Sequence, residues 1–399
     1  MSRCFCSGDV LLPKEQFEKW AVIACDQHTS DIAYWEEVRQ NVNGTPSSLE
    51  LILPEAELHL LSDERIHTIT ENMGRYLSDG TLVTYPNCYV YVERVLLDGS
   101  VRQGIVGVID LERYDIDPNE NTLVFATEGT VPERLPPRIR IRQDAPMELS
   151  HCVVFCDDKE GALIEKIGAS KEKLKKIYGF DLMCGGGRID GWLVDGAAAD
   201  AFGAAIDRYE QEHIYLVGDG NHSLLTAKRC YEKMKDTQPR HIWENAPARF
   251  AMVELENIHS PAMCFEPIYR VIEDTDPDAL ICALESIADP DGVAIEVYTG
   301  QKQMEIKLPV GENELTVGVL QRFLDKWLQE NKGQIDYIHG KDVLIRLAQR
   351  ENSVGILLPD FDKGMLFPYI HSGKITPRKT FSIGHAAEKR YYVEGRKIL

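Results

Sequence analysis

The sequence predicts a mixed α/β fold of the α+β type, and two patterns carry this prediction. Short runs of apolar, β-prone residues, such as 152–155, 214–217 and 250–255, have the length and composition of buried strands. Longer segments, such as 61–78 and 197–211, repeat their apolar residues at helical spacing. The two patterns alternate along the chain, so both helices and strands are expected to contribute to the core.

The N-terminal part of the chain predicts a strand, a helix and a hairpin. Residues 18–27 predict a strand that stops at Asp26. A helix follows it, and Thr29, Ser30 or Asp31 is expected to be its cap. The segments 88–96 and 101–109 predict a β-hairpin, because the Asp98-Gly99 pair between them favours a tight turn.

Further along the chain, the positions of prolines, charged residues and apolar residues predict the secondary structure. The Pro-rich stretch 131–137 is expected to be a loop or an extended segment, because proline lacks a backbone N–H. Residues 171–178 predict a charged helix. The last part alternates predicted helices (278–287, 316–331 and 341–350) with predicted strands (292–298, 303–308 and 354–358).

The length of 399 residues is sufficient for two or three domains of about 150 residues each. An acidic stretch, Glu273-Asp-Thr-Asp-Pro-Asp278, interrupts the apolar pattern and favours a boundary there. We therefore expect one domain over residues 1–272 and an α+β domain over residues 273–399.

The formal net charge of −20 argues against a nucleic-acid partner, because the phosphate backbone is repelled by an acidic protein. Two basic islands interrupt this background, at residues 134–142 and 374–397. They favour a small anionic ligand such as a nucleotide or a phosphorylated metabolite. Salt bridges to acidic neighbours are the alternative interpretation of the same residues.

The sequence predicts a cytoplasmic protein that does not enter a membrane. No run approaches about 18 uncharged apolar residues, and the N-terminus lacks the apolar core of a signal peptide. The ten cysteines are scattered and form no matching pairs with zinc-ligand spacing. The oligomeric state is open, and a homodimer is one of the alternatives.

The segment Val217-Gly-Asp-Gly-Asn-His-Ser223 joins a predicted strand to a predicted helix. Gly218 and Gly220 permit a sharp turn, and a helix N-terminus offers free N–H groups to an anion. Asp219 and His222 have the chemistry to bind a metal, move a proton or contact a phosphate. The alternative is an ordinary turn in which Asn221 or Ser223 caps the helix.

Several motifs of this chain resemble those of the domain-of-unknown-function 1015 family. The segment Asp219-Gly-Asn-His-Ser223 is similar to the Asp-Gly-His-His-Arg signature of that family. Thr127-Glu-Gly-Thr130, followed by Arg138, resembles a His-Glu-x-Thr element and its arginine. Further resemblance lies in Glu266-Pro-Ile-Tyr-Arg270, in Tyr337-Ile-His-Gly340 and in Gly373-Lys-Ile-Thr-Pro-Arg-Lys-Thr380.

The family is related to free serine kinases, which phosphorylate L-serine with a nucleotide donor. The resemblance therefore implies a ParB/sulfiredoxin-like nucleotide-binding core, with Mg²⁺ and ATP or ADP as cofactors. It implies a carboxylate base at Asp26, and we add His28 and His222 as a candidate acid–base pair. The remaining implied residues fall into three groups: Gly218, Asp219, Gly220, Asn221, His222 and Ser223 for the nucleotide, Asp219 for the metal, and Glu128, Thr130, Arg138, Arg270, Arg378, Lys379 and Thr380 for substrate or phosphate.

Three positions depart from the family pattern, namely Asn221, Ser223 and Tyr269. The family has histidine at the first and third of these positions and arginine at the second. The missing arginine removes a bidentate, permanently charged phosphate ligand. Arg138, Arg142 or Lys379 are candidates to replace it.

Three functions are compatible with the sequence. The first is a metal-dependent kinase that phosphorylates a free, serine-like amino acid or a similar hydroxylated metabolite. The second is a non-catalytic nucleotide-binding regulatory module that uses the same turn. The third is a phosphate-ester hydrolase that uses Asp219, His222 and a metal.

Overall fold

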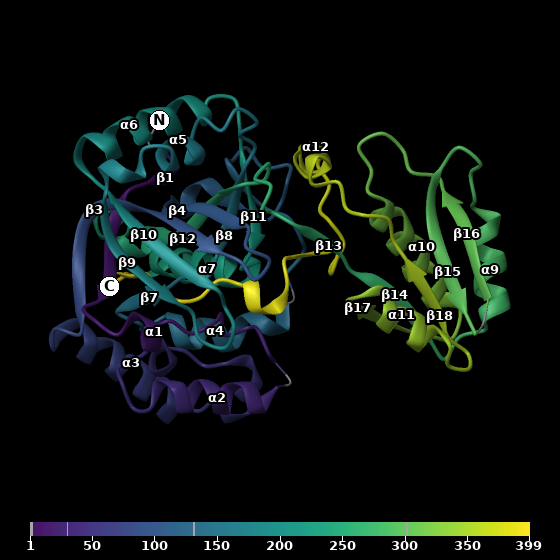
Figure 1. Ribbon diagram of the computed structural model, residues 1–399, viewed down its shortest axis with the longest axis horizontal. Coiled ribbons are helices and arrows are strands. Elements are labelled where there is room, and N and C mark those ends of the chain that lie inside the picture. The colour runs from purple at the N-terminus through teal and green to yellow at the C-terminus, as the bar shows by residue number, and fades with distance from the viewer. Residues whose placement is uncertain (1–2, 30, 131, 301) are drawn as a thin grey trace. The chain divides into compact units, whose positions relative to one another are not determined.

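The computed structural model describes residues 3–399 except 30, 131 and 301, and it divides into two compact units. Unit 1 comprises Met1–Met263 and His385–Leu399, and unit 2 comprises Cys264–Gly384 (Figure 1). The chain returns to unit 1 at His385, so its last residues pack with the unit that contains the N-terminus. Among the described residues, no helix has both the length and the apolar character needed to cross a membrane.

A large mixed sheet forms the centre of unit 1. Its main path runs in the order β5-β6-β11-β8-β12-β4-β3-β2-β20-β7, while β1 pairs with β4, and β10 pairs with β3 and β9. The strands are β1 (Phe5–Cys6), β2 (Gly8–Pro13), β3 (Leu82–Val95), β4 (Val101–Asp110), β5 (Tyr114–Asp115), β6 (Val124–Ala126), β7 (Met147–Leu149), β8 (Val153–Cys156), β9 (Lys175–Asp181), β10 (Arg188–Val194), β11 (Tyr215–Asp219), β12 (Phe250–Asn257) and β20 (Gly395–Lys397).

The helices of unit 1 are only in part those that the sequence predicts. They are α1 (Phe17–Trp20), α2 (Ile32–Val42), α3 (Asp63–Ser78), α4 (Leu135–Arg142), α5 (Ile164–Gly168), α6 (Gly196–Tyr209), α7 (Asn221–Thr237) and α8 (Arg240–Trp243). The side chain of Asp31 caps α2 by accepting a hydrogen bond from the Tyr34 N–H, as expected for one of the three candidates. Ser30, another candidate, lies outside the described residues.

The order of strands places three loop segments at one edge of the sheet. β6 runs parallel to β11, whereas β8 runs antiparallel to it, with Asp219 opposite Val153. The residues just before β8 therefore lie beside the residues just after β11. The segment after β6, which begins at Thr127, ends at the same edge, and Thr127 Oγ1 donates a hydrogen bond of 2.6 Å to the Val217 carbonyl.

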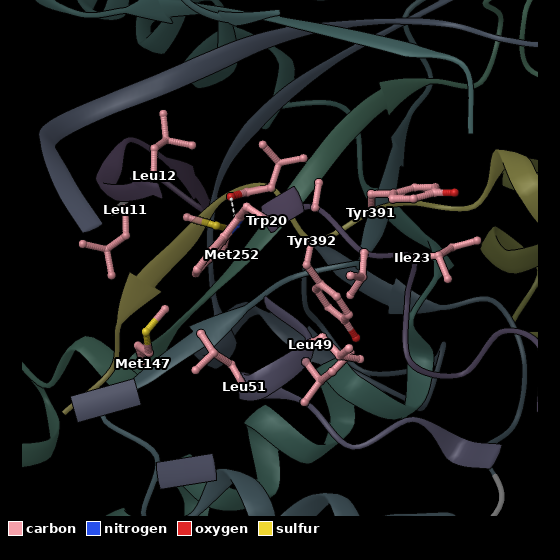
Figure 2. Packing of buried hydrophobic residues seen from close by; sticks show 14 of the residues in the cluster. Leu11, Leu12, Trp20, Ile23, Leu49, Leu51, Met147, Met252, Tyr391 and Tyr392 are labelled. Carbon is pink, nitrogen blue, oxygen red and sulfur yellow. Dashed lines mark hydrogen bonds between the residues drawn. The ribbon is translucent and has the colours of Figure 1, made fainter. Parts of the chain in front are cut away.

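The C-terminal segment is part of the core of unit 1. Trp20 is almost fully buried, and its indole N–H donates to the Val393 carbonyl at 3.0 Å. Ile23 forms an isolated antiparallel bridge with Tyr391. Figure 2 shows Trp20, Ile23, Tyr391 and Tyr392 packed with apolar side chains from the N-terminal half. This packing fixes the C-terminal residues against the segment that contains Asp26.

Unit 2 is a smaller α+β body that confirms the predicted alternation of its helices and strands. One sheet has the order β16-β15-β18-β14-β17, and a second pairs β13 with β19. The elements are β13 (Phe265–Pro267), β14 (Tyr269–Glu273), α9 (Pro277–Ser286), β15 (Val293–Thr299), β16 (Lys302–Leu308), α10 (Thr316–Glu330), β17 (Gln334–Ile338), α11 (Lys341–Ala348), β18 (Val354–Leu357), α12 (Leu366–His371) and β19 (Phe381–Ile383).

Three local predictions are wrong. Residues 18–27 do not form a strand, because they begin with α1 and continue as an extended segment that makes one bridge. The Pro-rich stretch is helical from Pro132, since prolines at the first positions of a helix sacrifice no intrahelical hydrogen bond. Residues 171–178 form a 3-10 helix and the start of β9, because pairing with β10 outweighs their helical propensity.

Candidate functional site

The central turn has the geometry of an anion-binding helix N-terminus. Gly220 is the N-cap of α7 and adopts a left-handed conformation, with φ 82° and ψ 22°. A Cβ atom there would lie 2.8 Å from Cys152 Sγ and 2.9 Å from Cys152 Cα, so both the backbone and the space require glycine. The first N–H groups of this long helix follow directly after Gly220.

The helix cap differs from the expected one. Neither Asn221 nor Ser223 caps α7, because Asn221 is already the first helical residue and the cap position has no side chain. The Ser223 hydroxyl instead lies 3.3 Å from His151 Nε2. Ser223 is therefore available to the site instead of being used to start the helix.

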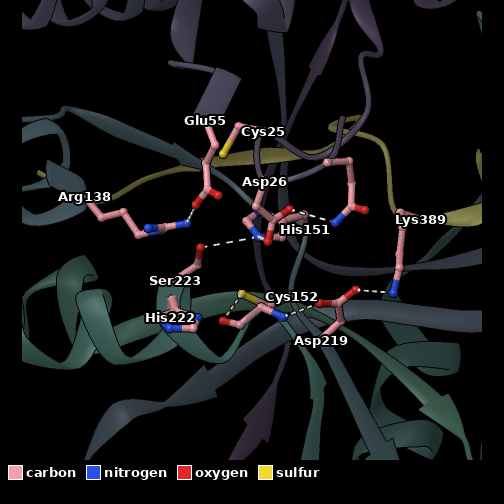
Figure 3. A network of polar contacts seen from close by, with 12 residues as sticks. Cys25, Asp26, Glu55, Arg138, His151, Cys152, Asp219, His222, Ser223 and Lys389 are labelled. Atoms are coloured by element: carbon pink, nitrogen blue, oxygen red, sulfur yellow. Dashed lines mark hydrogen bonds and ion pairs between the residues drawn. The ribbon is translucent and has the colours of Figure 1, made fainter. Parts of the chain in front are cut away.

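His151 connects the two turns that the sequence analysis singled out (Figure 3). Its Nε2 atom lies 3.3 Å from Ser223 Oγ and 3.7 Å from Asp26 Oδ2. The Tyr392 hydroxyl accepts the Cys25 N–H at 3.2 Å and lies 3.0 Å from His151 Nδ1, to which it can donate its own proton. Nε2 is thus the ring nitrogen that faces both Asp26 and Ser223.

The surroundings of Asp26 keep its carboxyl group ionised. Burial opposes ionisation, but the charge of His151 and the hydrogen bond from Gln27 outweigh it, and the pKa of Asp26 lies below its usual value. Arg138 and Lys389 act in the same direction. The Asp26 side chain is 23% exposed and that of His151 only 6%, so Asp26 is the more accessible of the two groups.

Lys389 brings a positive charge to the central turn. Its Nζ lies 3.2 Å from Asp219 Oδ2, while Asp219 Oδ1 accepts the Gly220 N–H at 2.9 Å. The buried Arg94 donates to the carbonyls of Ala387, Glu388 and Lys389, so the backbone that carries Lys389 is held in place.

Most of the other basic residues near the site have acidic partners. Arg138 is ion-paired with Glu55, and Arg142 Nη1 lies 2.5 Å from Glu148 Oε2. Within the C-terminal island, Arg390 pairs with both Glu254 and Glu394. The salt-bridge interpretation of the basic islands therefore holds for these arginines.

His28 and His222 lie at different parts of the two turns. His28 has a left-handed φ of 50° and stacks on the Tyr34 ring, with 3.7 Å between the ring centroids. Burial lowers the pKa of His28, although Asp31 acts against that shift. His222 lies on the first turn of α7, where its carbonyl accepts a hydrogen bond of 2.7 Å from Thr226 Oγ1. Their pairing as general acid and base stays a prediction.

Glu128 and Thr130 follow β6, so the sheet brings their segment to the edge at which β11 ends. The other predicted substrate residues, Arg378, Lys379 and Thr380, belong to unit 2 together with Arg270. Thr380 Oγ1 donates to the Pro377 carbonyl at 2.6 Å, and Lys379 has a left-handed φ of 56°.

Arg270 has a position that differs from the one expected of a substrate ligand. Its side chain is fully buried and donates to the carbonyls of Ile268, Arg378 and Lys379. Burial lowers the pKa of Arg270 to about 10. The guanidinium group therefore holds the backbone of the Arg378-Lys379 segment.

The described residues gather no group of three His, Cys, Asp or Glu side chains that could hold a metal by themselves. Asp219 is nevertheless suited to the role predicted for it, because magnesium commonly binds to one or two carboxylates together with phosphate oxygens and water. A metal at Asp219 thus requires a bound nucleotide to complete its ligands and has to compete with Lys389.

Three residues of this site are not predicted by the sequence: His151, Lys389 and Tyr392. His151 directly precedes a predicted strand, and only the antiparallel pairing of β8 with β11 places it beside Ser223. Lys389 belongs to a basic island that the sequence does identify, but its partner Asp219 is 170 residues away.

The fold and this site define a mixed α/β protein with a strand–glycine–helix turn next to an ionised carboxylate. The family described as "Protein of unknown function (DUF1015)" matches residues 9–357, so the chain belongs to that family. No curated protein matches the chain.

Solved structures with a similar fold include a free serine kinase mutant in complex with AMP. It is 13% identical, with 73% of this chain and 90% of that chain covered and a TM-score of 0.39. A conserved hypothetical protein from Pyrococcus furiosus is 12% identical, with 73% and 94% covered and a TM-score of 0.34. SbnI with a C-terminal truncation, from Staphylococcus aureus, is 11% identical, with 70% and 83% covered and a TM-score of 0.37.

Proposed function

We propose that this protein is a nucleotide-dependent kinase that phosphorylates a free, serine-like amino acid or a similar hydroxylated metabolite. The observation that carries the proposal is the connection of Asp26 through His151 to Ser223 at the N-terminus of α7. A phosphoryl transfer needs a place for the donor phosphates and a proton acceptor for the attacking hydroxyl. One network contains a candidate for each requirement.

In the proposed reaction, the acceptor hydroxyl oxygen attacks the terminal phosphorus of the nucleotide. A new O–P bond forms while the bond between that phosphorus and its bridging oxygen breaks, and the shortened nucleotide leaves with the electron pair. The hydroxyl proton goes to Asp26, which is ionised and more exposed than His151. The N–H groups after Gly220 bind the donor phosphates.

Lys389 supplies the positive charge that the family's arginine would provide at position 223. It approaches the same turn from the C-terminal segment, and its side chain is 14% exposed. Arg138 and Arg142, which are alternatives from the sequence, are already paired with Glu55 and Glu148. A phosphate that enters the turn replaces Asp219 as the anionic partner of Lys389.

Magnesium fits this proposal with Asp219 as its protein ligand, and when bound it would neutralise charge on the transferred phosphate. A ParB/sulfiredoxin-like core for unit 1, and a contribution of Lys379 and Thr380 to acceptor binding, are further parts of the proposal. They rest on the motif resemblance alone.

The test is a turnover assay with magnesium, several nucleotides and L-serine or related acceptors, in which the phosphorylated product is detected. Formation of a phosphorylated acceptor supports the proposal. Tight nucleotide binding without product would favour the regulatory module, and release of free phosphate without an acceptor would favour the hydrolase. If Asp219→Ala leaves magnesium-dependent nucleotide binding unchanged, the central turn is only structural.

A further inference from the structure

A cavity of about 140 Å³ lies within unit 1 beside the first turn of α7. Its walls are formed by residues of α3, α4, α7 and β7 and by the segment around residues 51–58, and we refer to it as the α4 cavity. The lining is mostly apolar and includes Leu51, Leu53, Met73, Ile141, Ala145 and Met147. Most of these side chains are buried, so the apolar character belongs to the interior of the unit.

The polar lining of the α4 cavity is concentrated in a few groups. His151 and Ser223 line it, which connects the cavity to the Asp26 network. Glu55 and Arg138 also line it and are ion-paired with side-chain exposures of only 9% and 14%. Figure 3 shows Glu55, Arg138, Cys25 and Ser223 around His151.

Arg142 lines the cavity, and one of its donors is unused among the described residues. Its Nη1 atom is paired with Glu148, but its buried Nη2 atom has no hydrogen-bond partner among the described residues. A buried donor without a partner is unfavourable. A ligand carboxylate is the group that best satisfies a guanidinium N–H, because both charge and hydrogen-bond geometry match.

The volume of the α4 cavity limits the size of the ligand that it can hold. An apolar protein cavity of roughly 150 Å³ accommodates a molecule of the size of benzene. The α4 cavity therefore has room for an apolar body of about six carbon atoms. Free serine has almost no apolar body and would leave most of this space unfilled.

We propose that the α4 cavity binds a small carboxylic acid with an apolar chain, with its carboxylate on Arg142 and its chain against the leucine and methionine side chains. The next step rests on the proposed function: this ligand is the phosphate acceptor, and its hydroxyl is directed toward His151 and Ser223. The carboxylate and the apolar chain are shared by hydroxy acids and by their α-amino counterparts. The acceptor class is thus larger and more apolar than serine.

The binding test uses isothermal titration without nucleotide, with hexanoate, norleucine, hexanol and L-serine as probes. We expect hexanoate or norleucine to bind at least tenfold more tightly than hexanol or serine. Arg142→Met should remove that preference over hexanol, whereas binding of hexanol itself stays the same. If hexanol binds as well as hexanoate to the unmodified protein, or if neither acid binds, the proposal is wrong.

A second variant fills the cavity. Ala145→Leu should weaken hexanoate binding at least tenfold, whereas Ala197→Leu, the same substitution at an exposed position of α6, should leave it unchanged. ADP should bind equally to all three proteins. If Ala145→Leu abolishes ADP binding as well, the cavity holds the nucleobase and the proposal is overturned.

Turnover separates this inference from the proposed function. If the protein is a kinase, kcat/KM for β-hydroxyleucine should exceed that for serine at least tenfold, and a preference for serine would refute the acceptor class. If no acceptor is phosphorylated but hexanoate still binds and Ala145→Leu prevents it, the kinase proposal fails while the cavity site stands.

Discussion

Lys389 Nζ lies 3.2 Å from Asp219 Oδ2, and this ion pair joins the C-terminal segment to the central turn of unit 1. The pair is possible because Arg94 and Arg102, both buried, donate to backbone carbonyls between residues 387 and 389. Two arginines from the central sheet thus position a lysine at the helix N-terminus that lacks the family's own arginine.

Replacing Lys389 by methionine should weaken binding of a nucleoside triphosphate roughly 10- to 100-fold, since a charge-assisted hydrogen bond contributes about 1.5–3 kcal/mol. Binding of the unphosphorylated nucleoside should stay within about twofold, because the ligand contact proposed for this lysine is with phosphate alone. Titration calorimetry with both ligands measures the difference. Lys397→Met, at an exposed position of β20, is the matched control. Equal loss for nucleoside and triphosphate would contradict a phosphate contact.

Asp26→Asn should lower kcat by about 10²- to 10⁴-fold, the usual contribution of a general base, while the nucleotide dissociation constant changes little. The amide keeps the shape of the side chain but cannot accept the proton. Asp31→Asn is the control, because asparagine also caps helices and α2 should persist. An active Asp26→Asn protein would show that the base is another group.

His151→Asn should move the acidic limb of the pH profile of kcat/KM to higher pH. Burial raises the pKa of Asp26 and the charge of His151 lowers it, so removal of the histidine leaves the effect of burial less opposed. His259→Asn, which alters a different His–Asp pair with Asp157, should leave the limb in place. A limb that stays fixed or moves to lower pH in His151→Asn would count against this account of Asp26.

Glu256→Gln should change how stability depends on pH. Burial raises the pKa of Glu256 from 4.5 to about 7, with Arg102 acting against the shift. Between these values the folded protein binds more protons at this site than the unfolded chain, so the carboxyl group lowers stability as pH rises. Each pKa unit corresponds to about 1.4 kcal/mol, and the variant should therefore be a few kcal/mol more stable above pH 7.

Urea unfolding at several pH values between about 4.5 and 8 measures this difference. Glu160→Gln, at an exposed position, should follow the unmodified protein throughout. If Glu256→Gln is less stable at the upper end of the range, the contact of Glu256 with Arg102 outweighs the effect of burial.

Arg270→Met should loosen the segment 378–380 without unfolding the rest of unit 2. The variant leaves the carbonyls of Arg378 and Lys379 without their donor, and a buried polar group without a partner costs about 1–3 kcal/mol. Hydrogen exchange of residues 378–380 should accelerate by at least tenfold. Arg346→Met, on α11 of the same unit, is the control. Unchanged exchange in Arg270→Met would show that the segment is held by other contacts.

Much of the secondary structure could be predicted because it depends on local periodicity. The three helices and three strands predicted between residues 278 and 358, the hairpin of β3 and β4, and the β11–α7 turn all appear where their apolar spacing and their glycines place them. The prediction failed where pairing with a neighbouring strand decided the outcome, as in residues 175–178, which pair with β10 despite their charged, helix-like pattern.

The site itself was predicted only in part. The turn from Gly218 to Ser223 follows from the sequence, because a glycine-containing turn between a strand and a helix has a recognisable pattern, whereas Asp26 is singled out only by the resemblance to the family. By contrast, the contact of Arg138 with Glu55 and the burial of Arg270 against carbonyl oxygens depend on segments that are far apart in the chain.

By itself, the sequence determined the mixed α/β class, the family motifs and the position of the glycine turn, because these depend on the order and spacing of nearby residues. The tertiary structure alone decided that His151 lies between Asp26 and Ser223, and that Lys389 reaches Asp219. The physical reason is strand pairing, since the antiparallel register of β8 on β11 and the return of the C-terminal segment bring together residues that no local pattern relates.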